Sequence, residues 1–370
     1  MLKTLKKVFT FVLVSRLRVE ELKNDREWED FVQTIPEATF YHTIKWKNII
    51  EKSFRFVPAY LTIKDREEIV GVCPGFVTAP SRFRIYSSLP HSDYGGSLFK
   101  SAYSARGASF LLNFLTKYCS AMKISYAKLC FLCNVPKQFS NVPFTRIDRS
   151  KGIPETDLKT TSSEFIWKAL PRIVRRKIRH IEKEGFKFEE INSKSGLKEF
   201  YSLYRSNMRY IRASAYPYEF FENLWDTLPS EELKGWLLTG NRILGGSLSF
   251  VYRQTLYSTF IGINRKTTSN QHNLSVVPYF IWNRIKWAEE NGLRYVSMGS
   301  TPSDPTHFYY RQKMQFGAKF FQQEIALIPF NYNAKALLKI REKAIPAWKN
   351  IRNLLPTNVK TLLEDRLFQL

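Results

Sequence analysis

One pattern occurs twice in this chain, as Ile69-Val-Gly-Val-Cys-Pro-Gly-Phe-Val77 and again as Ile243-Leu-Gly-Gly-Ser-Leu-Ser-Phe-Val251. Each copy is an apolar run that follows a polar turn, which is typical of a strand leaving a hairpin. An amphipathic helical stretch and a further apolar strand follow each copy, over 110–133 in the first half and over 279–298 in the second. This recurring order predicts two similar domains of the α/β (α+β) class, each built on a mixed sheet.

The domain boundaries are expected where this periodicity stops. It is interrupted between the two copies by Pro143, Gly152, Pro154 and the Thr-Thr-Ser-Ser cluster at 160–163. Such residues mark loops and linkers. We therefore expect a first domain over 16–145 and a second over 160–330. Residues 331–370 are predicted to form a basic C-terminal helical tail, which either docks on the second domain or binds a membrane surface or a partner.

The net charge is the most informative feature of the composition. Lys and Arg total 57 against 33 Asp and Glu, which gives a net charge of +24. An excess of this size favours a polyanionic partner, either tRNA or another nucleic acid, an anionic membrane face or a phosphorylated carrier. The alternative is that the charge only confers solubility. The apolar fraction of 44% excludes collagenous, low-complexity and wholly disordered chains.

The N-terminus and the cysteines indicate the compartment. The apolar run 8–14 is far shorter than the roughly 18 to 20 residues that span a bilayer, and no Ala-x-Ala-like cleavage site follows it. We expect this segment to be a first strand or a basic segment on a membrane surface, rather than a signal peptide. The four cysteines are too few and too irregularly spaced for a disulfide framework. A cytoplasmic protein is therefore predicted.

The motifs of several enzyme classes are missing from the sequence. It contains no GxGxxG, GxxxxGK[ST], GxSxG or HExxH, so P-loop nucleotide hydrolysis, serine hydrolysis and zinc proteolysis lose their usual support. The five histidines never pair at metal-ligand spacing. Cys130 and Cys133 form a CxxC, but they lie in an apolar, strand-like run, so we expect core packing there rather than metal or redox chemistry. No metal is expected.

A basic helix is predicted over 171–185. Its cations recur at helical spacing and are Arg172, Arg175, Arg176, Arg179 and Lys183. Val174, Ile178 and Ile181 fall on the opposite face, so one side is expected to pack while the other stays cationic. The cationic face is a candidate binding site for an anionic substrate. The alternative is an ordinary solvated surface.

Two loops are candidate ligand sites. The first, Ser88-Leu-Pro-His-Ser-Asp-Tyr-Gly-Gly96, follows a strand, and its paired glycines permit close approach of backbone N–H groups to a ligand. The second runs from 297 to 317, from a strand end through a polar loop into an Arg- and Lys-bearing helix or turn. Ligands often bind at such carboxyl ends of strands.

Eight short segments follow one another along the chain, namely Trp28 with 31–32, 40–46, 69–71, 89–96, 175–185, 245–246, 287–292 and 313–317. Taken in this order, they resemble those of Fem-like aminoacyl (peptidyl) transferases and of the related BioF2-like acetyltransferases with duplicated GNAT-like domains. The likeness covers about residues 20 to 330. Each segment is short, and it is their order and spacing that carry the resemblance.

The resemblance implies two tandem GNAT-like domains and the transfer of an acyl or aminoacyl group onto an amine. In the Fem branch it implies an aminoacyl-tRNA donor and an acceptor that is a peptidoglycan precursor of the cell wall. The stretch 262–277 contains no R/QxxGxG/A pyrophosphate loop, and no long helical hairpin follows Gly185. The donor therefore stays open between acyl-CoA and aminoacyl-tRNA, and no permanently bound cofactor is expected. A noncatalytic module that binds nucleic acid or membrane is the rival interpretation.

The resemblance and the two candidate loops together indicate the site residues. Lys313 matches the lysine before the Phe-Gly of the Fem-like pattern, where it is implicated in stabilising the transition state. Asp93 is expected to accept the proton of the incoming ammonium, with Asp304 as a second candidate. The substrate-binding candidates are Tyr94, Gly95, Gly96, Ser300, Tyr309, Tyr310 and Arg311, together with the arginines of the basic helix. The alternative for Lys313 is an ordinary surface lysine.

Overall fold

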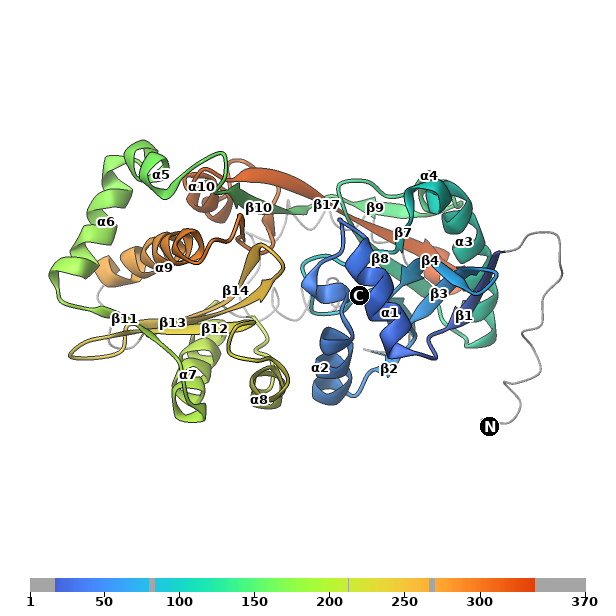
Figure 1. Cartoon of the computed structure of the whole chain (residues 1–370), viewed down its shortest axis with the longest axis horizontal. Coiled ribbons are helices and arrows are strands. Elements are labelled where there is room, and N and C mark those ends of the chain that lie inside the picture. Colours follow the sequence, from blue (N-terminus) through green and yellow to red (C-terminus); the bar gives the residue numbers. More distant parts are fainter. Residues whose placement is uncertain (1–16, 80–83, 212, 266–269, 337–370) are drawn as a thin grey trace.

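The computed structural model describes residues 17–79, 84–211, 213–265 and 270–336. It forms two lobes that lie side by side and are bridged by one long strand (Figure 1). The predicted N-terminal segment 8–14 lies outside the described residues, as does nearly all of the predicted tail over 331–370. No helix in the described part of the chain is long and apolar enough to cross a membrane.

The two lobes repeat one order of elements. The first lobe contains β1 (Leu17–Glu21), α1 (Asp25–Thr34), α2 (Ile44–Phe54), β3 (Leu61–Asp65), β4 (Glu68–Cys73), β7 (Leu98–Phe99), α3 (Ser104–Ala121) and β8 (Tyr126–Leu132). The second contains β11 (Lys187–Glu190), α7 (Lys194–Tyr210), α8 (Tyr218–Thr227), β12 (Leu233–Thr239), β13 (Gly245–Tyr252), β14 (Thr255–Ile263), α9 (Asn270–Glu290) and β15 (Tyr295–Ser297). The predicted duplication of mixed αβ domains is therefore confirmed.

The sheets repeat the same arrangement. Strands β1-β3-β4-β7 and β11-β12-β13-β14 are both antiparallel runs of four, so β4 and β13, which hold the two copies of the repeated pattern, take the third place in each. The predicted single strand 69–77 is wrong in its second half. The chain leaves β4 at Pro74 and Gly75, and Phe76–Thr78 (β5) joins the other sheet. Pro74 has no N–H to continue the ladder.

Each lobe has a long helix between its last two strands, α3 in the first lobe and α9 in the second, which we call the central helix. The strand before the central helix and the strand after it separate. Strand β14 pairs in parallel with β15 only over Thr255–Tyr257, so residues 258–263 of β14 lie beyond this pairing. In the first lobe, β7 and β8 belong to different sheets. Short strands β2 (Val57–Pro58) and β6 (Ile85–Ser87) lie on the β8 side of that separation. Each lobe therefore opens beside its central helix.

The lobes share strands. Strand β17 (Lys319–Pro329) pairs with β10 (Lys151–Asp157) through its first residues and with β8 through the rest, and β9 (Arg146–Asp148) joins it. Strand β10 in turn pairs with β15 of the second lobe and with β16 (Thr301–Pro302). One 13-stranded sheet therefore crosses the molecule (Figure 1). The boundaries 16–145 and 160–330 stay a prediction.

An aromatic core joins the lobes where α2 faces α8 (Figure 1). Phe40 of the short helix η2 (Phe40–His42) stacks on Phe250, with ring centroids 4.9 Å apart. Trp46 meets Phe220 edge-on at 6.0 Å. Arg253 of the second lobe donates hydrogen bonds to carbonyl oxygens at the end of α1, including those of Val32 and Ile35 at 2.9 Å. Burial of these large rings stabilises this interface.

The helices after the linker follow the sequence pattern closely. Helix α5 (Ser163–Ala169) is capped by Ser162, whose hydroxyl accepts from the Phe165 N–H. Helix α6 (Arg172–Lys183) begins directly after Pro171 and buries Val174, Ile178 and Ile181, as predicted. Helix α9 packs against α6, and its Tyr279, Phe280 and Trp282 belong to the same apolar cluster as the buried side chains of α6. The remaining described elements are η3 (Ser101–Tyr103), α4 (Lys137–Ser140) and α10 (Phe308–Met314).

Candidate functional site

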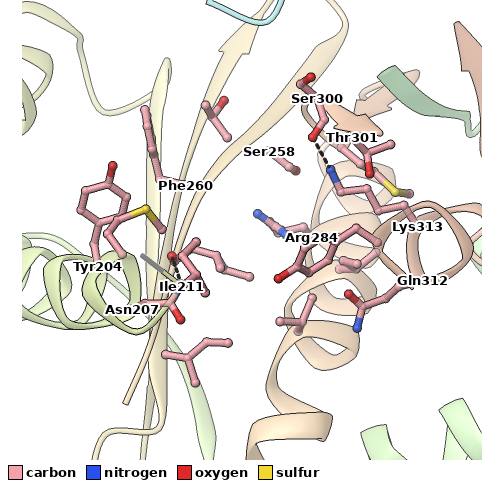
Figure 2. A pocket seen from close by; sticks show the side chains of 18 of the residues that line it. Tyr204, Asn207, Ile211, Ser258, Phe260, Arg284, Ser300, Thr301, Gln312 and Lys313 are labelled. Atoms are coloured by element: carbon pink, nitrogen blue, oxygen red, sulfur yellow. Dashed lines mark hydrogen bonds between the residues drawn. The ribbon is translucent and has the colours of Figure 1, made fainter. Parts of the chain in front are cut away.

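A cavity of about 420 Å³ lies where β14 and β15 separate, and we call it the second-lobe cavity. In Figure 2, Tyr204, Asn207 and Phe260 line one side of it, from α7 and β14. Arg284 of α9 and Lys313 of α10 line the other. The separated strands that the repeat builds into the lobe thus leave space for a ligand.

Lys313 extends from α10 towards the loop that follows β15. Its Nζ donates hydrogen bonds to the carbonyl oxygens of Gly299 at 2.9 Å and Ser300 at 3.2 Å. Gly299 has φ +68, and a Cβ there would lie 3.2 Å from the carbonyl oxygen of Ser258, so glycine suits this turn. Burial lowers the pKa of Lys313 to about 8, a net shift that the carboxylate of Asp93 opposes and the nearby guanidinium of Arg284 assists. The ammonium is therefore mainly charged at neutral pH, with a third N–H left for a ligand.

Asp93 reaches this loop from the first lobe. Its Oδ1 accepts from the backbone N–H of Ser300 at 3.1 Å, and its Oδ2 accepts from the hydroxyl of Tyr41 at 3.2 Å. The buried position of Tyr41 and the adjacent carboxylate of Asp93 both raise the pKa of its hydroxyl. Three predicted site residues, Asp93, Ser300 and Lys313, are thus brought together from two lobes.

A second space, which we call the inter-lobe cavity, measures about 550 Å³. It is lined by the loop that ends at Asp93, by Lys128 of β8 and Lys151 of β10, and by Gln323 of β17. It shares four lining residues with the second-lobe cavity, namely Tyr216, Thr259, Phe260 and Ser300. The two cavities therefore meet beside Asp93 and Ser300.

The paired glycines and Tyr94 lie away from this junction. Tyr94 is buried edge-on against Tyr41, with ring centroids 5.6 Å apart. A Cβ on Gly95 would meet Leu89 at 2.0 Å, and one on Gly96 would meet Phe131 at 2.5 Å. Together with Tyr94 they line a cavity of about 660 Å³ in the first lobe, which we call the first-lobe cavity. Their place in the structure is explained by close packing.

The other candidates from the second loop scatter around α10. Tyr309 lines the second-lobe cavity, whereas Tyr310 packs on Phe320 with ring centroids 5.0 Å apart. Arg311 lies in a small groove of about 240 Å³ with Lys177 of α6. Asp304 is exposed, and its Oδ1 accepts from the N–H of Thr306 at 2.8 Å. Asp304 is therefore a turn-forming residue that the structure does not bring to Lys313.

The arginines of α6 face away from the two cavities that meet at Asp93. Arg175 donates to the carbonyl oxygen of Lys168 at 2.9 Å, and the guanidinium of Arg179 lies 5.4 Å from the ring centre of Trp167. Arg172 and Arg176 are exposed. None of these four arginines lines the second-lobe or the inter-lobe cavity. Their role as an anion-binding face stays a prediction.

Sequence reasoning missed two site residues. Arg284 interrupts the apolar face of α9, and a charge at a position that should be buried was the available signal. Tyr41 belongs to an aromatic stretch that gave no hint of its contact with Asp93. Cys130 is buried in β8, as expected for core packing, whereas Cys133 follows the strand and is only half-buried. No group of three His, Cys, Asp or Glu side chains in the described part of the chain is placed to hold a metal ion.

Comparisons with known proteins agree with this architecture. Residues 170–309 match the family model for the acetyltransferase (GNAT) domain. The crystal structure of FemX is similar with a TM-score of 0.60 and 13% identity, over 85% of this chain and 98% of that one. The L-PGS of Bacillus licheniformis is similar with a TM-score of 0.54 and 11% identity, over 96% and 99%. No curated protein sequence matches the chain.

A tandem GNAT protein from the clavulanic acid biosynthesis pathway is also similar, with a TM-score of 0.53 and 10% identity, over 85% of this chain and 99% of that one. At such identities the structural likeness establishes the fold. The expected resemblance to Fem-like and tandem GNAT transferases is confirmed at that level. Residues 170–309, which match the GNAT domain, contribute most of the side chains that line the second-lobe cavity. This match supports acyltransferase activity.

Proposed function

We propose that this protein transfers an acyl or aminoacyl group to an amine and so forms an amide. The observation that carries the proposal is the junction of the two cavities, where the buried ammonium of Lys313 and the carboxylate of Asp93 hold the same loop from opposite lobes. A cation and a carboxylate at one junction suit a reaction that develops negative charge on an oxygen and releases a proton from nitrogen.

The donor occupies the second-lobe cavity, with its carbonyl carbon at the junction, and the acceptor amine enters through the inter-lobe cavity. Asp93 accepts the proton that the ammonium of the acceptor must lose before it attacks. The amine nitrogen then bonds to the carbonyl carbon, and the free N–H of Lys313 stabilises the tetrahedral oxyanion. When that intermediate collapses, the bond to the sulfur or oxygen of the carrier breaks, and the carrier leaves with one proton.

The donor is either an aminoacyl-tRNA or an acyl-CoA. The GNAT-domain match favours an acyl-CoA-dependent N-acyltransferase, whereas the likeness to FemX and the net charge of +24 favour a polyanionic aminoacyl carrier. The acceptor that we propose is a precursor of the cell envelope, such as a peptidoglycan or lipid-linked precursor. The protein would then act in the cytoplasm, at the periphery of the anionic inner face of the membrane.

A two-donor assay tests this proposal. Purified protein is incubated with amine acceptors and either a panel of acyl-CoAs, with release of free thiol as the readout, or a mixture of radiolabelled aminoacyl-tRNAs, with amide product as the readout. Lys313→Met is the inactive reference, and Lys319→Met, an exposed lysine on β17, is the matched control. We expect one donor class to be consumed by the wild type and the control only. Equal turnover by wild type and Lys313→Met would refute the proposal.

A further inference from the structure

Arg284 is a buried cation inside the second-lobe cavity. It lies on α9 with 5% of its surface exposed, and its Nε donates to the carbonyl oxygen of Phe280 in the same helix at 3.2 Å. Within the described residues, no carboxylate pairs with it. Figure 2 shows its guanidinium projecting into the space between β14 and α10. A charge held out of water without a counter-charge is destabilising.

The rest of the cavity wall is also positively charged. Its charged lining residues are Arg265, Arg284 and Lys313, and its described lining includes no Asp or Glu. The side-chain hydroxyls of Ser258, Ser300 and Thr301 also line it, are buried, and have no hydrogen-bond partner among the described residues. Buried hydroxyls normally find partners. The described wall of the cavity thus presents cations and three unsatisfied hydroxyls without a carboxylate to balance the charge.

We propose that Arg284 binds an anionic oxygen group, a phosphate or a carboxylate, on the molecule that occupies the second-lobe cavity. A guanidinium donates two parallel hydrogen bonds to either group, and the unpaired hydroxyls supply further donors around it. The anion restores the missing counter-charge. A phosphate would come from the carrier of the donor, and a carboxylate from the transferred acyl group. The reading of this anion as part of the donor rests on the proposed function, whereas anion binding itself does not.

The test measures binding without turnover. Isothermal titration calorimetry of the full chain is carried out with inorganic pyrophosphate and, separately, with glutarate, so that the two arms distinguish a carrier phosphate from an acyl carboxylate. Arg284→Met removes the charge and retains the length of the side chain, and Arg205→Met, an exposed arginine of α7, removes the same charge elsewhere. We expect at least about tenfold weaker binding in Arg284→Met and no more than about twofold in the control, since charge-assisted hydrogen bonds are lost only in the first.

A second variant provides the test if Arg284→Met does not fold. Thr301→Val keeps the shape of a buried side chain and removes one donor hydroxyl, so it is expected to weaken binding of the same anion about threefold or more. Binding of neither anion to the wild type at millimolar concentration would overturn the inference. So would unchanged binding in folded Arg284→Met or, if that variant does not fold, unchanged binding in Thr301→Val. If the wild type binds an anion that Arg284→Met does not bind, yet the wild type transfers no acyl group, the anion site stands and only the proposed function is rejected.

Discussion

The first-lobe and second-lobe cavities occupy corresponding places in the repeat. Each lies beside the central helix, between the strand before that helix and the strand after it, and each is closed by the connection between the two helices of its lobe. That connection contributes Thr39 and His42 in the first lobe and Ser214 and Tyr216 in the second. The described lining of the second-lobe cavity contains three cations, whereas that of the first contains no Lys or Arg. The fold therefore supplies a cavity twice, and the side chains equip one of them to bind an anion.

His42 illustrates why the described lining of the first-lobe cavity carries no cation. Its Nε2 lies 3.0 Å from the carbonyl oxygen of Gly96, and its Nδ1 lies 2.9 Å from the hydroxyl of Thr39. Burial lowers the pKa of this histidine to about 4. The imidazole is thus neutral at physiological pH and holds the Gly95-Gly96 turn against η2. It packs the lobe, whereas Lys313 in the other lobe stays charged and is left with a free N–H.

Lys313→Met is expected to cause the largest change. Loss of a preorganised donor to an oxyanion lowers kcat by about 10² to 10³. A matched change in the first-lobe cavity, Ser101→Ala, should leave kcat within about twofold, because nothing reacts there. Steady-state kinetics of both variants with the donor found by the two-donor assay checks the comparison. A comparable loss in Ser101→Ala would show that both cavities serve the reaction.

Acid destabilisation through His42 is the next largest effect. Its pKa is about 4 in the folded protein against 6.5 in the unfolded chain, so the unfolded state alone takes up a proton as the pH falls from 6.5 to 4. This uptake removes about 3 kcal/mol of folding stability across that range. Urea unfolding of wild type and His42→Gln between these pH values measures it. The variant should show a shallower loss, and parallel curves would mean that the imidazole is not buried as a neutral group.

Arg253→Met should have a moderate effect on how firmly the lobes are joined. The substitution leaves the carbonyl oxygens of Val32 and Ile35 without their charged donor, which we expect to cost about 1 to 3 kcal/mol of unfolding free energy. Lys187→Met, at an exposed position on β11 of the second lobe, is the surface control. Urea unfolding should show one cooperative transition for both variants. Separate transitions for the lobes would instead reveal that they are stable alone.

The smallest expected effect is a shift of the alkaline limb of the pH–rate profile. Activity should fall as the pH rises through about 8, because Lys313 then loses its proton. Arg284→Met removes a nearby positive charge, so the pKa of Lys313 should rise and the limb should move to higher pH. Profiles of kcat for both proteins check this. A shift to lower pH would mean that Arg284 acts on Lys313 by some means other than charge.

The sequence predicted the repeat because apolar periodicity is a local property of each strand and helix. It placed the two hairpins, the central helices and the strands after them, since each can be read from a few neighbouring residues. It failed at Pro74, where the chain changes sheets, because apolar residues continue on both sides of the break. It also could not foresee that β17 joins β8 and β10, since pairing between distant segments leaves no local mark.

The candidate site could likewise be predicted only in part from the sequence. Asp93 and Lys313 stood out through short segments that resemble a known family, and the structure brings both to one loop. Tyr94 to Gly96 stood out for the same reason, yet they are held by packing. Arg284 was missed because its importance depends on what surrounds it, namely three hydroxyls and a lysine that come from other elements. Local pattern identifies elements, whereas a donor-rich cavity exists only once they are assembled.

The bridging strand β17 also governs the order in which the protein can fold during synthesis. Strand β8 leaves the ribosome about 190 residues before β17 does, which takes roughly 10 to 40 s at about 5 to 20 residues per second. For that time one edge of β8 has no neighbour. Strand β10 has none on either edge until residues 295–302 supply β15 and β16, and open edges pair readily with other chains. The first half of a nascent chain is thus unable to complete its sheet before residues 319–329 arrive. Premature termination would release an aggregation-prone fragment rather than a free-standing first lobe.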